Sequence, residues 1–306
     1  MLRSALIFQW RPRVTKSHSN QCQPAIFDRN SRQHLFIEFI QRPGASAGAM
    51  SSAMAALAAV ESGNVKPVLA FSPALCQLLG YEVEFPDFSL EGVVPATQAD
   101  LLVWLQAEHR SDLFDVAMAM RSIVDEHFSV QLEQDGFVYH DMRDLTGFVD
   151  GIGNPEGDKA LAAAVIPEGQ PGAGGSFVFG QLWRHDLAAF NELDVSEQEN
   201  VIGRTKVDAV EFDSERMPAD AHVGRTDTDH DGVPQKIWRR SVPFGNSSQH
   251  GLYFLAFSCE WQRFDYLLRR MYGMTDDAVR DRLISFSSPQ TGSYWFAPTQ
   301  SMLAGL

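Results

Sequence analysis

The order of its hydrophobic segments constrains the fold of this chain more than any other feature. In the first half, short apolar runs with strand character alternate with longer runs at helical spacing. The predicted order is strand, helix, strand, strand, helix, strand, over residues 34–40, 50–60, 65–71, 101–107, 111–128 and a closing pair of short strands at 130–132 and 137–140. A ferredoxin-like α+β sandwich requires this order, with helices covering one face of an antiparallel sheet.

A similar order recurs in the second half. Strands are predicted at 176–186, 236–242, 250–261 and 293–298, and helices over 187–203 and 264–271. Ser196 and Glu199 have the spacing of a capping box, and Gly203 is expected to end the helix that they open. We therefore predict a duplicated ferredoxin-like α+β fold of the dimeric α+β barrel type, with two antiparallel sheets each covered by helices. The predicted domains are residues 22–150 and 151–306, after a flexible leader at residues 1–21.

Composition narrows the classes of function. The 306 residues include 39 acidic and 25 basic side chains, and the net charge of −14 would repel a nucleic-acid backbone or an anionic membrane. No run approaches the roughly 18 apolar residues of a spanning helix, so we expect a cytoplasmic protein. Cys22, Cys76 and Cys259 are too widely spaced for a disulfide framework or a metal-binding knuckle and are expected to be buried thiols.

Two motifs that suggest ligand binding are incomplete. Asp227, Asp229 and Asp231 resemble the start of a calcium loop, but Trp238 stands where a bidentate Glu is needed. The glycine-rich stretch 172–175 precedes a predicted strand, whereas phosphate-binding glycines follow a strand and open a helix. Neither calcium nor nucleotide binding is therefore predicted.

One acidic and one imidazole side chain are candidates for chemistry. Asp150 lies between glycines in Gly147-Phe148-Val149-Asp150-Gly151, which suits a tight turn that aims a carboxylate into a cavity. The alternative is an Asx turn in which Asp150 only binds neighbouring amides. His222 lies in a loop before the predicted strand 236–242 and is a candidate iron ligand. The alternative, assigned to the other eight histidines, is an ordinary hydrogen-bonded residue.

Arginines supply the remaining candidates. In a strand, Arg239 and Ser241 would share one face while Arg240 points to the other. An inward guanidinium needs an anion or a developing oxyanion, although a structural salt bridge is the alternative. Arg204 follows the predicted helix end at Gly203 and could bind a carboxylate, or interact with the helix dipole.

Six motifs together resemble one protein family. They are DLTGFVDGIGNPEG at 144–157, VIGRTK at 201–206, AHVGR at 221–225, IWRRSVPFG at 237–245, HGLYFLAF at 250–257 and TGSYWFAP at 291–298. In this order and with these gaps, the chain from about residue 22 to its end resembles the bacterial, cytoplasmic dye-decolorizing (DyP-type) haem peroxidases.

The resemblance implies a haem b enzyme of two ferredoxin-like domains, with the haem held mainly by the second. It implies the following roles: His222 as axial iron ligand, Asp281 as acceptor of that histidine's other N–H, Arg204 as a propionate partner, Asp150 and Arg239 as the distal pair, and Ser241 as a distal hydrogen-bonding residue. Relatives often carry Asn at the position of Ser241.

The implied reaction is the reduction of hydrogen peroxide, with dyes or other small organic reductants oxidised in one-electron steps through a ferryl intermediate. A homo-oligomer is expected, and the tail by which some relatives load into encapsulin shells is not evident. Two other functions stay open. The first is a haem carrier or haem-iron-handling protein without physiological peroxidase turnover. The second is a haem-free α+β enzyme that uses Asp150 and His222 as an acid–base pair.

Overall fold

The first half of the chain forms the predicted ferredoxin-like unit. The computed structural model describes residues 22–83, 90 and 93–306, and the predicted leader at 1–21 lies outside them. After a 3-10 turn at Pro24–Phe27, the elements are β1 (Gln33–Gln41), α1 (Ala47–Ala58), β2 (Lys66–Phe71), α2 (Pro73–Leu79), β3 (Leu101–Ala107), α3 (Arg110–Val124) and β4 (Phe128–Phe137). The strands are antiparallel and lie in the order β4, β1, β3, β2.

The second half repeats this arrangement. It contains α4 (Asp158–Ala164), β5 (Ser176–His185), α5 (Leu187–Glu192), α6 (Val195–Ile202), α7 (His222–Thr226), the hairpin β6 (Asp229–His230) and β7 (Val233–Pro234), β8 (Trp238–Arg239), β9 (Val242–Gly245), β10 (His250–Ser258), α8 (Gln262–Met271), the 3-10 turn η2 (Arg282–Ser285), β11 (Ser287–Pro289), β12 (Ser293–Ala297) and α9 (Gln300–Ala304). The spatial order is β12, β5, β10, β8, with β9 also on β10. In both halves the last strand therefore lies beside the first, followed by the third and the second.

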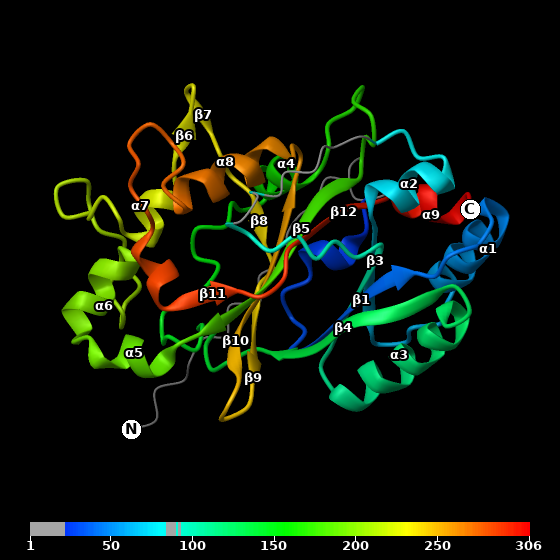
Figure 1. The fold of residues 1–306 in the computed structure, drawn as a ribbon, viewed down its shortest axis with the longest axis horizontal. Helices are drawn as coiled ribbons and strands as arrows, with labels where there is room; N and C mark the ends of the chain where they lie inside the picture. Colours follow the sequence, from blue (N-terminus) through cyan, green and yellow to red (C-terminus); the bar gives the residue numbers. More distant parts are fainter. Residues whose placement is uncertain (1–21, 84–89, 91–92) are drawn as a thin grey trace.

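The two predicted sheets join into one. The edge strands β12 and β2 pair at Phe296 and Phe71, which makes a single ten-stranded sheet. At its other end β9 lies against β4, so that the sheet nearly closes into a barrel. Figure 1 shows the strands between two groups of helices, with α1, α2, α3 and α9 on one side and α5, α6, α7 and α8 on the other.

Alternation along β1 explains why the strand is buried on both faces. Leu35, Ile37 and Phe39 pack beneath α1 and α3, whereas Phe36 points the other way, into a second core with the strands of the other half. Glu38 also points into this second core and is fully buried. In a strand that is covered on only one face, apolar residues alternate with polar ones. The nearly continuous apolar run of β1 therefore reflects burial on both faces.

Glu38 is the polar centre of the contact between the two halves. The hydroxyl of Tyr253 on β10 donates a hydrogen bond to Glu38 Oε1 at 2.7 Å, and the hydroxyl of Ser293 on β12 lies 3.4 Å from Oε2. Burial raises the pKa of Glu38 to about 7, and these two hydrogen bonds oppose the shift. A carboxyl from the first half is thus held by hydroxyls from the second.

Several element boundaries differ from the sequence-based prediction. The helix predicted to reach Phe128 ends at Val124, and Phe128 instead begins β4, which is one continuous strand where two short ones were predicted. The predicted strand 236–242 is divided into β8 and β9. The strand predicted to reach Trp261 ends at Ser258. Phe128 lies at helical spacing from Val124, and Trp261 is apolar like the strand before it, so hydrophobic periodicity alone did not mark these boundaries.

The predicted capping box was wrong, whereas the predicted helix end was confirmed. Asp194 caps α6, because its carboxylate accepts the Glu197 N–H at 2.9 Å, and Ser196 lies inside the first turn. Gly203 ends α6 with φ 91°, a left-handed conformation that glycine adopts without steric cost. A Cβ atom at Gly203 would also lie 2.7 Å from the sulfur of Met217.

The cysteines are placed as predicted. All three are free and buried, which confirms the expectation of buried thiols. Within the part of the chain that the structure describes, no helix combines the length and hydrophobicity needed to cross a bilayer.

Candidate functional site

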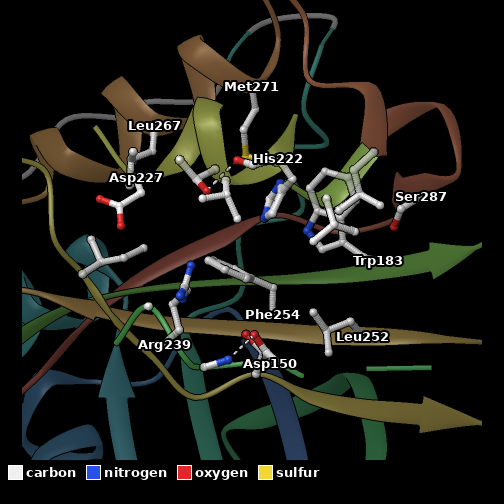
Figure 2. Close-up of a pocket in the computed structure, with 18 of the residues that line it drawn as sticks. Asp150, Trp183, His222, Asp227, Arg239, Leu252, Phe254, Leu267, Met271 and Ser287 are labelled. Carbon is white, nitrogen blue, oxygen red and sulfur yellow. Dashed lines mark hydrogen bonds between the residues drawn. The ribbon is translucent and has the colours of Figure 1, made fainter. Parts of the chain in front are cut away.

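A large cavity lies between the second-half sheet and the helices α7 and α8 (Figure 2). Leu252 and Phe254 of β10 line the sheet side, while Leu267 and Met271 of α8 line the helix side. The space amounts to about 1400 Å³, which includes the part open to solvent. A mostly apolar cavity of this size suits a large organic ligand that is oriented by a few polar groups.

His222 enters the cavity from the helix side. It is the first residue of α7, not part of a loop as predicted. Its Nδ1 lies 2.7 Å from Oδ2 of Asp281, whose other oxygen accepts the Leu283 N–H at 2.9 Å. Because an ionised carboxylate only accepts, Nδ1 carries the hydrogen and Nε2 is left for a ligand. Asp281 is fully buried, so it fixes both the tautomer and the direction of the imidazole ring.

Asp150 lies on the opposite side of the cavity from His222, as Figure 2 shows. Its Oδ1 accepts the Gly151 N–H at 2.7 Å, so the turn contact considered as an alternative is present alongside the cavity-facing position. Burial raises the pKa of Asp150, the Arg239 guanidinium acts to lower it, and the Asp144 carboxylate adds to the rise. Opposing charges thus control whether this carboxyl is ionised.

Arg239 is held beside Asp150 by Asn154. The Arg239 N–H donates to Asn154 Oδ1 at 2.9 Å, and Asn154 Nδ2 donates to the Arg239 carbonyl at 2.8 Å. Gly153 allows the guanidinium to approach, since a Cβ atom there would lie 2.9 Å from Arg239 Nη2. Arg239 Nε is buried and has no hydrogen-bond partner among residues 22–83, 90 and 93–306. A charged donor with an unused hydrogen indicates that the cavity binds an acceptor.

Asn154 was not singled out from the sequence, although it belongs to the quoted stretch 144–157. The available signal for Asn154 in the sequence was its position as a polar residue between two turn-forming residues, Gly153 and Pro155. Its two backbone hydrogen bonds, with a strand 85 positions further along the chain, could not be inferred from that signal.

The predicted alternation around Arg239 was confirmed despite the break in the strand. Ser241 lines the same cavity. Arg240 points away, where it donates to the Ile26 carbonyl and to Gln106 Oε1, both at 3.1 Å. Burial lowers the pKa of Arg240 to about 9.

Arg204 also reaches the cavity. Arg204 is buried and forms an ion pair with Glu211. The backbones of these two residues also pair in an isolated antiparallel β-bridge. Arg204 Nη2 would lie 3.7 Å from a Cβ atom at Gly153, so two guanidiniums, those of Arg204 and Arg239, converge on this glycine. Two positively charged side chains thus lie at one edge of the cavity, and Glu211 pairs with that of Arg204.

His185 is a cavity residue to which the sequence analysis assigned no special part. It follows Phe179, Gln181 and Trp183 on the cavity face of β5, so the two-residue period of that strand was the missed signal. Its Nδ1 lies 2.8 Å from Ser287 Oγ, and its Nε2 lies 3.1 Å from Asp144 Oδ1.

The amino-acid sequence is similar to those of dye-decolorizing peroxidases. A family model described as Dyp-type peroxidase, C-terminal, matches residues 141–302. Two curated relatives called dye-decolorizing peroxidase, from Mycolicibacterium paratuberculosis and Mycobacterium tuberculosis, are 40% and 38% identical over 213 residues. These matches cover 68% of this chain but only 60% and 64% of the relatives, which is less than two thirds of their lengths.

Solved structures share the fold as well. A dye-decolorizing protein from V. cholerae has a TM-score of 0.83 at 35% identity, over 92% of this chain and 99% of that chain. A variant of DypB from Rhodococcus jostii RHA1, solved in complex with heme, has a TM-score of 0.81 at 29% identity, over 90% of this chain and 96% of the other. With the matched family model and the shared fold, this chain belongs to the Dyp-type peroxidase family.

Proposed function

We propose that this chain is a haem b peroxidase that reduces hydrogen peroxide and oxidises dyes or other small organic reductants in one-electron steps. The observation that carries the proposal is the arrangement across the cavity. An imidazole held by a buried carboxylate faces an acid and a guanidinium that has an unused donor. The similar DypB structure in complex with heme supports the same choice of cofactor.

The residues present fit a haem group. The apolar walls suit the faces of a macrocycle, and His222 would offer Nε2 to the haem iron. Asp281 would increase the electron donation of that imidazole, and Arg204 at the positive edge would pair with a propionate. When bound, the haem supplies the redox chemistry, in which peroxide is reduced and an organic molecule gives up an electron.

Asp150 would transfer a proton during the reaction with peroxide, and Arg239 would stabilise negative charge. An ionised Asp150 would take a proton from one oxygen of the peroxide and return it to the other oxygen, which leaves as water. Arg239 keeps its charge throughout and stabilises the negative charge that gathers on the departing oxygen. Its charge also favours the ionised, proton-accepting form of Asp150. Ser241 lies on the same face of the sheet and offers a further hydrogen bond.

The spectrum of the purified protein tests the cofactor. We expect a Soret band that is lost in His222→Ala, because His185, the other imidazole lining the cavity, has both ring nitrogens engaged by Ser287 and Asp144. A chain that never shows this band would contradict the proposal and favour a haem-free acid–base enzyme.

Peroxide consumption with a reducing dye tests the activity. We expect Asp150→Ala and Arg239→Ala to retain haem and to lose about a hundredfold or more in the rate of reaction with peroxide. Bound haem without turnover in the wild-type protein would favour a haem carrier.

We also propose that the protein is cytoplasmic and forms a homo-oligomer. Closed homo-oligomers are the common state of soluble enzymes. Cell fractionation and light scattering of the purified protein would test these two points.

A further inference from the structure

A second group of titratable residues lies in the cavity wall, behind Asp150. His185 on β5 connects Ser287 on β11 with Asp144, through contacts of 2.8 Å and 3.1 Å. The side chains of His185 and Asp144 are only 6% and 14% exposed. Neither residue has a part in the peroxide chemistry proposed above, so their pairing calls for a separate explanation.

Asp144 is held as a carboxylate. Burial alone would raise the pKa of Asp144, but hydrogen bonds from His185 and from the hydroxyl and amide of Thr146 lower it below its ordinary value. A buried negative charge is therefore present in this wall, and His185 is the side chain that can compensate it when the imidazole is protonated.

The backbone brings this charge close to Asp150. The Asp144 N–H donates to the Phe148 carbonyl at 2.8 Å, and the Asp150 N–H donates to the Met142 carbonyl at 2.9 Å. Residues 142–150 thus form a short antiparallel ribbon. Asp144 and Asp150 are diagonal neighbours on the same face of it, with a typical separation of about 7–8 Å. The Asp144 carboxylate is accordingly one of the charges that raise the pKa of Asp150.

We propose that His185 is a positioning residue for Asp150, acting through Asp144. By pairing with the Asp144 carboxylate, it sets how strongly that negative charge opposes ionisation of Asp150. The role rests on the proposed function, because it concerns the acid that handles the protons of peroxide. Arg239 from β8 also faces Asp150, and its positive charge favours the ionised form of Asp150, while His222 faces Asp150 from α7 across the cavity.

The protonation of His185 therefore has a defined direction of effect. A protonated imidazole compensates Asp144, so Asp150 ionises more easily. A neutral imidazole leaves the Asp144 charge to act on Asp150, which then holds its proton to higher pH. Arg204 lies on the same cavity and adds positive charge that does not change with pH.

The test is a pH titration of the haem-loaded protein in its ferrous, carbon monoxide-bound form. The infrared stretching frequency of the bound carbon monoxide responds to charges around it and needs no turnover. A pH-dependent change in this frequency that is present in the wild type and absent in Asp150→Asn is assigned to ionisation of Asp150. In Asp144→Asn we expect its midpoint to move down by about one to two pH units, the size of a like-charge interaction at this separation.

His185→Gln keeps an amide that can donate to Asp144 but cannot be protonated. We expect it to move the midpoint up, and the double variant Asp144→Asn/His185→Gln to titrate like Asp144→Asn alone. Ser287→Ala is the matched control, because it removes a hydrogen bond of His185 without changing a charge. Its midpoint should stay within about 0.3 units of the wild type.

Three results would overturn the role of His185. The first is an unmoved midpoint in Asp144→Asn, and the second is an unmoved midpoint in His185→Gln. The third is a double variant whose midpoint shift is the sum of two non-zero single shifts. A merely structural part for these residues would lower haem occupancy without moving the midpoint, which is also a refutation. A protein without a Soret band would instead refute the proposed function itself.

Discussion

Glu38 should make the stability of the folded chain depend on pH in an unusual direction. Burial raises the pKa of this carboxyl from 4.5 to about 7. In the unfolded chain Glu38 ionises near pH 4.5, whereas in the folded chain it holds its proton up to about pH 7. The stabilisation is therefore fully present below pH 4.5 and is lost as the pH rises through about 7.

The size of this effect follows from the shift. One pKa unit corresponds to about 1.4 kcal/mol, so the difference between 4.5 and about 7 amounts to about 3 kcal/mol. Glu38→Gln removes the titration while keeping the side-chain length and an oxygen that can accept from Tyr253. We therefore expect the variant to gain about 3 kcal/mol over the wild type between about pH 4 and pH 8.

Urea unfolding of both proteins at these two pH values, with equal haem content, measures the gain. Differences between variants cancel the contributions of all other carboxyls. Glu133→Gln on β4 is the control, since its exposed side chain should change the stability by less than about 0.5 kcal/mol at either pH. A Glu38→Gln variant whose advantage is the same at both pH values would refute the reasoning, because the buried carboxyl would then not titrate in the window expected.

Three further substitutions test the site and its support. Arg239→Lys should slow the reaction with peroxide about tenfold or more in stopped-flow measurements, since an ammonium lacks the planar fork; an unchanged rate would contradict that role. Asp281→Asn should weaken haem binding about 10–100-fold in a haem titration, because His222 loses its charged acceptor; wild-type affinity would argue against it. Gly203→Ala should cost about 1–3 kcal/mol in urea unfolding, because its positive φ is strained for alanine and the new Cβ meets Met217; a loss below about 0.5 kcal/mol would count against this account.

Much of the fold was predictable because its signals are local. The strand at β10 and the helix at α8 follow from apolar runs and from helical spacing within about ten residues. The end of α6 follows from Gly203, since a glycine after a periodic segment marks a left-handed turn. Boundaries were less predictable where an apolar residue beyond the end of an element keeps the spacing of that element, as Phe128 of β4 does with Val124 of α3 across three polar residues.

The candidate site was predictable in part. The motif containing Asp150 and the alternation of Arg239 and Ser241 are local features of the sequence, and the structure brings these side chains into one cavity with His222. The hydrogen bonds between the Asn154 side chain and the Arg239 backbone join residues 85 positions apart, so no local pattern in the sequence indicated them.

The sequence by itself determined the main strands and helices of each half, because their patterns are local, and also the acidic character of the chain and the residue types available for chemistry. Only the tertiary structure decided that the two sheets join at β12 and β2, and that Glu38 is enclosed by hydroxyls from the other half. It also decided that Asp281 holds His222 and that His185 reaches Asp144. The physical reason is that proton affinity and hydrogen bonding depend on distance and burial, and packing sets both between residues far apart in the chain.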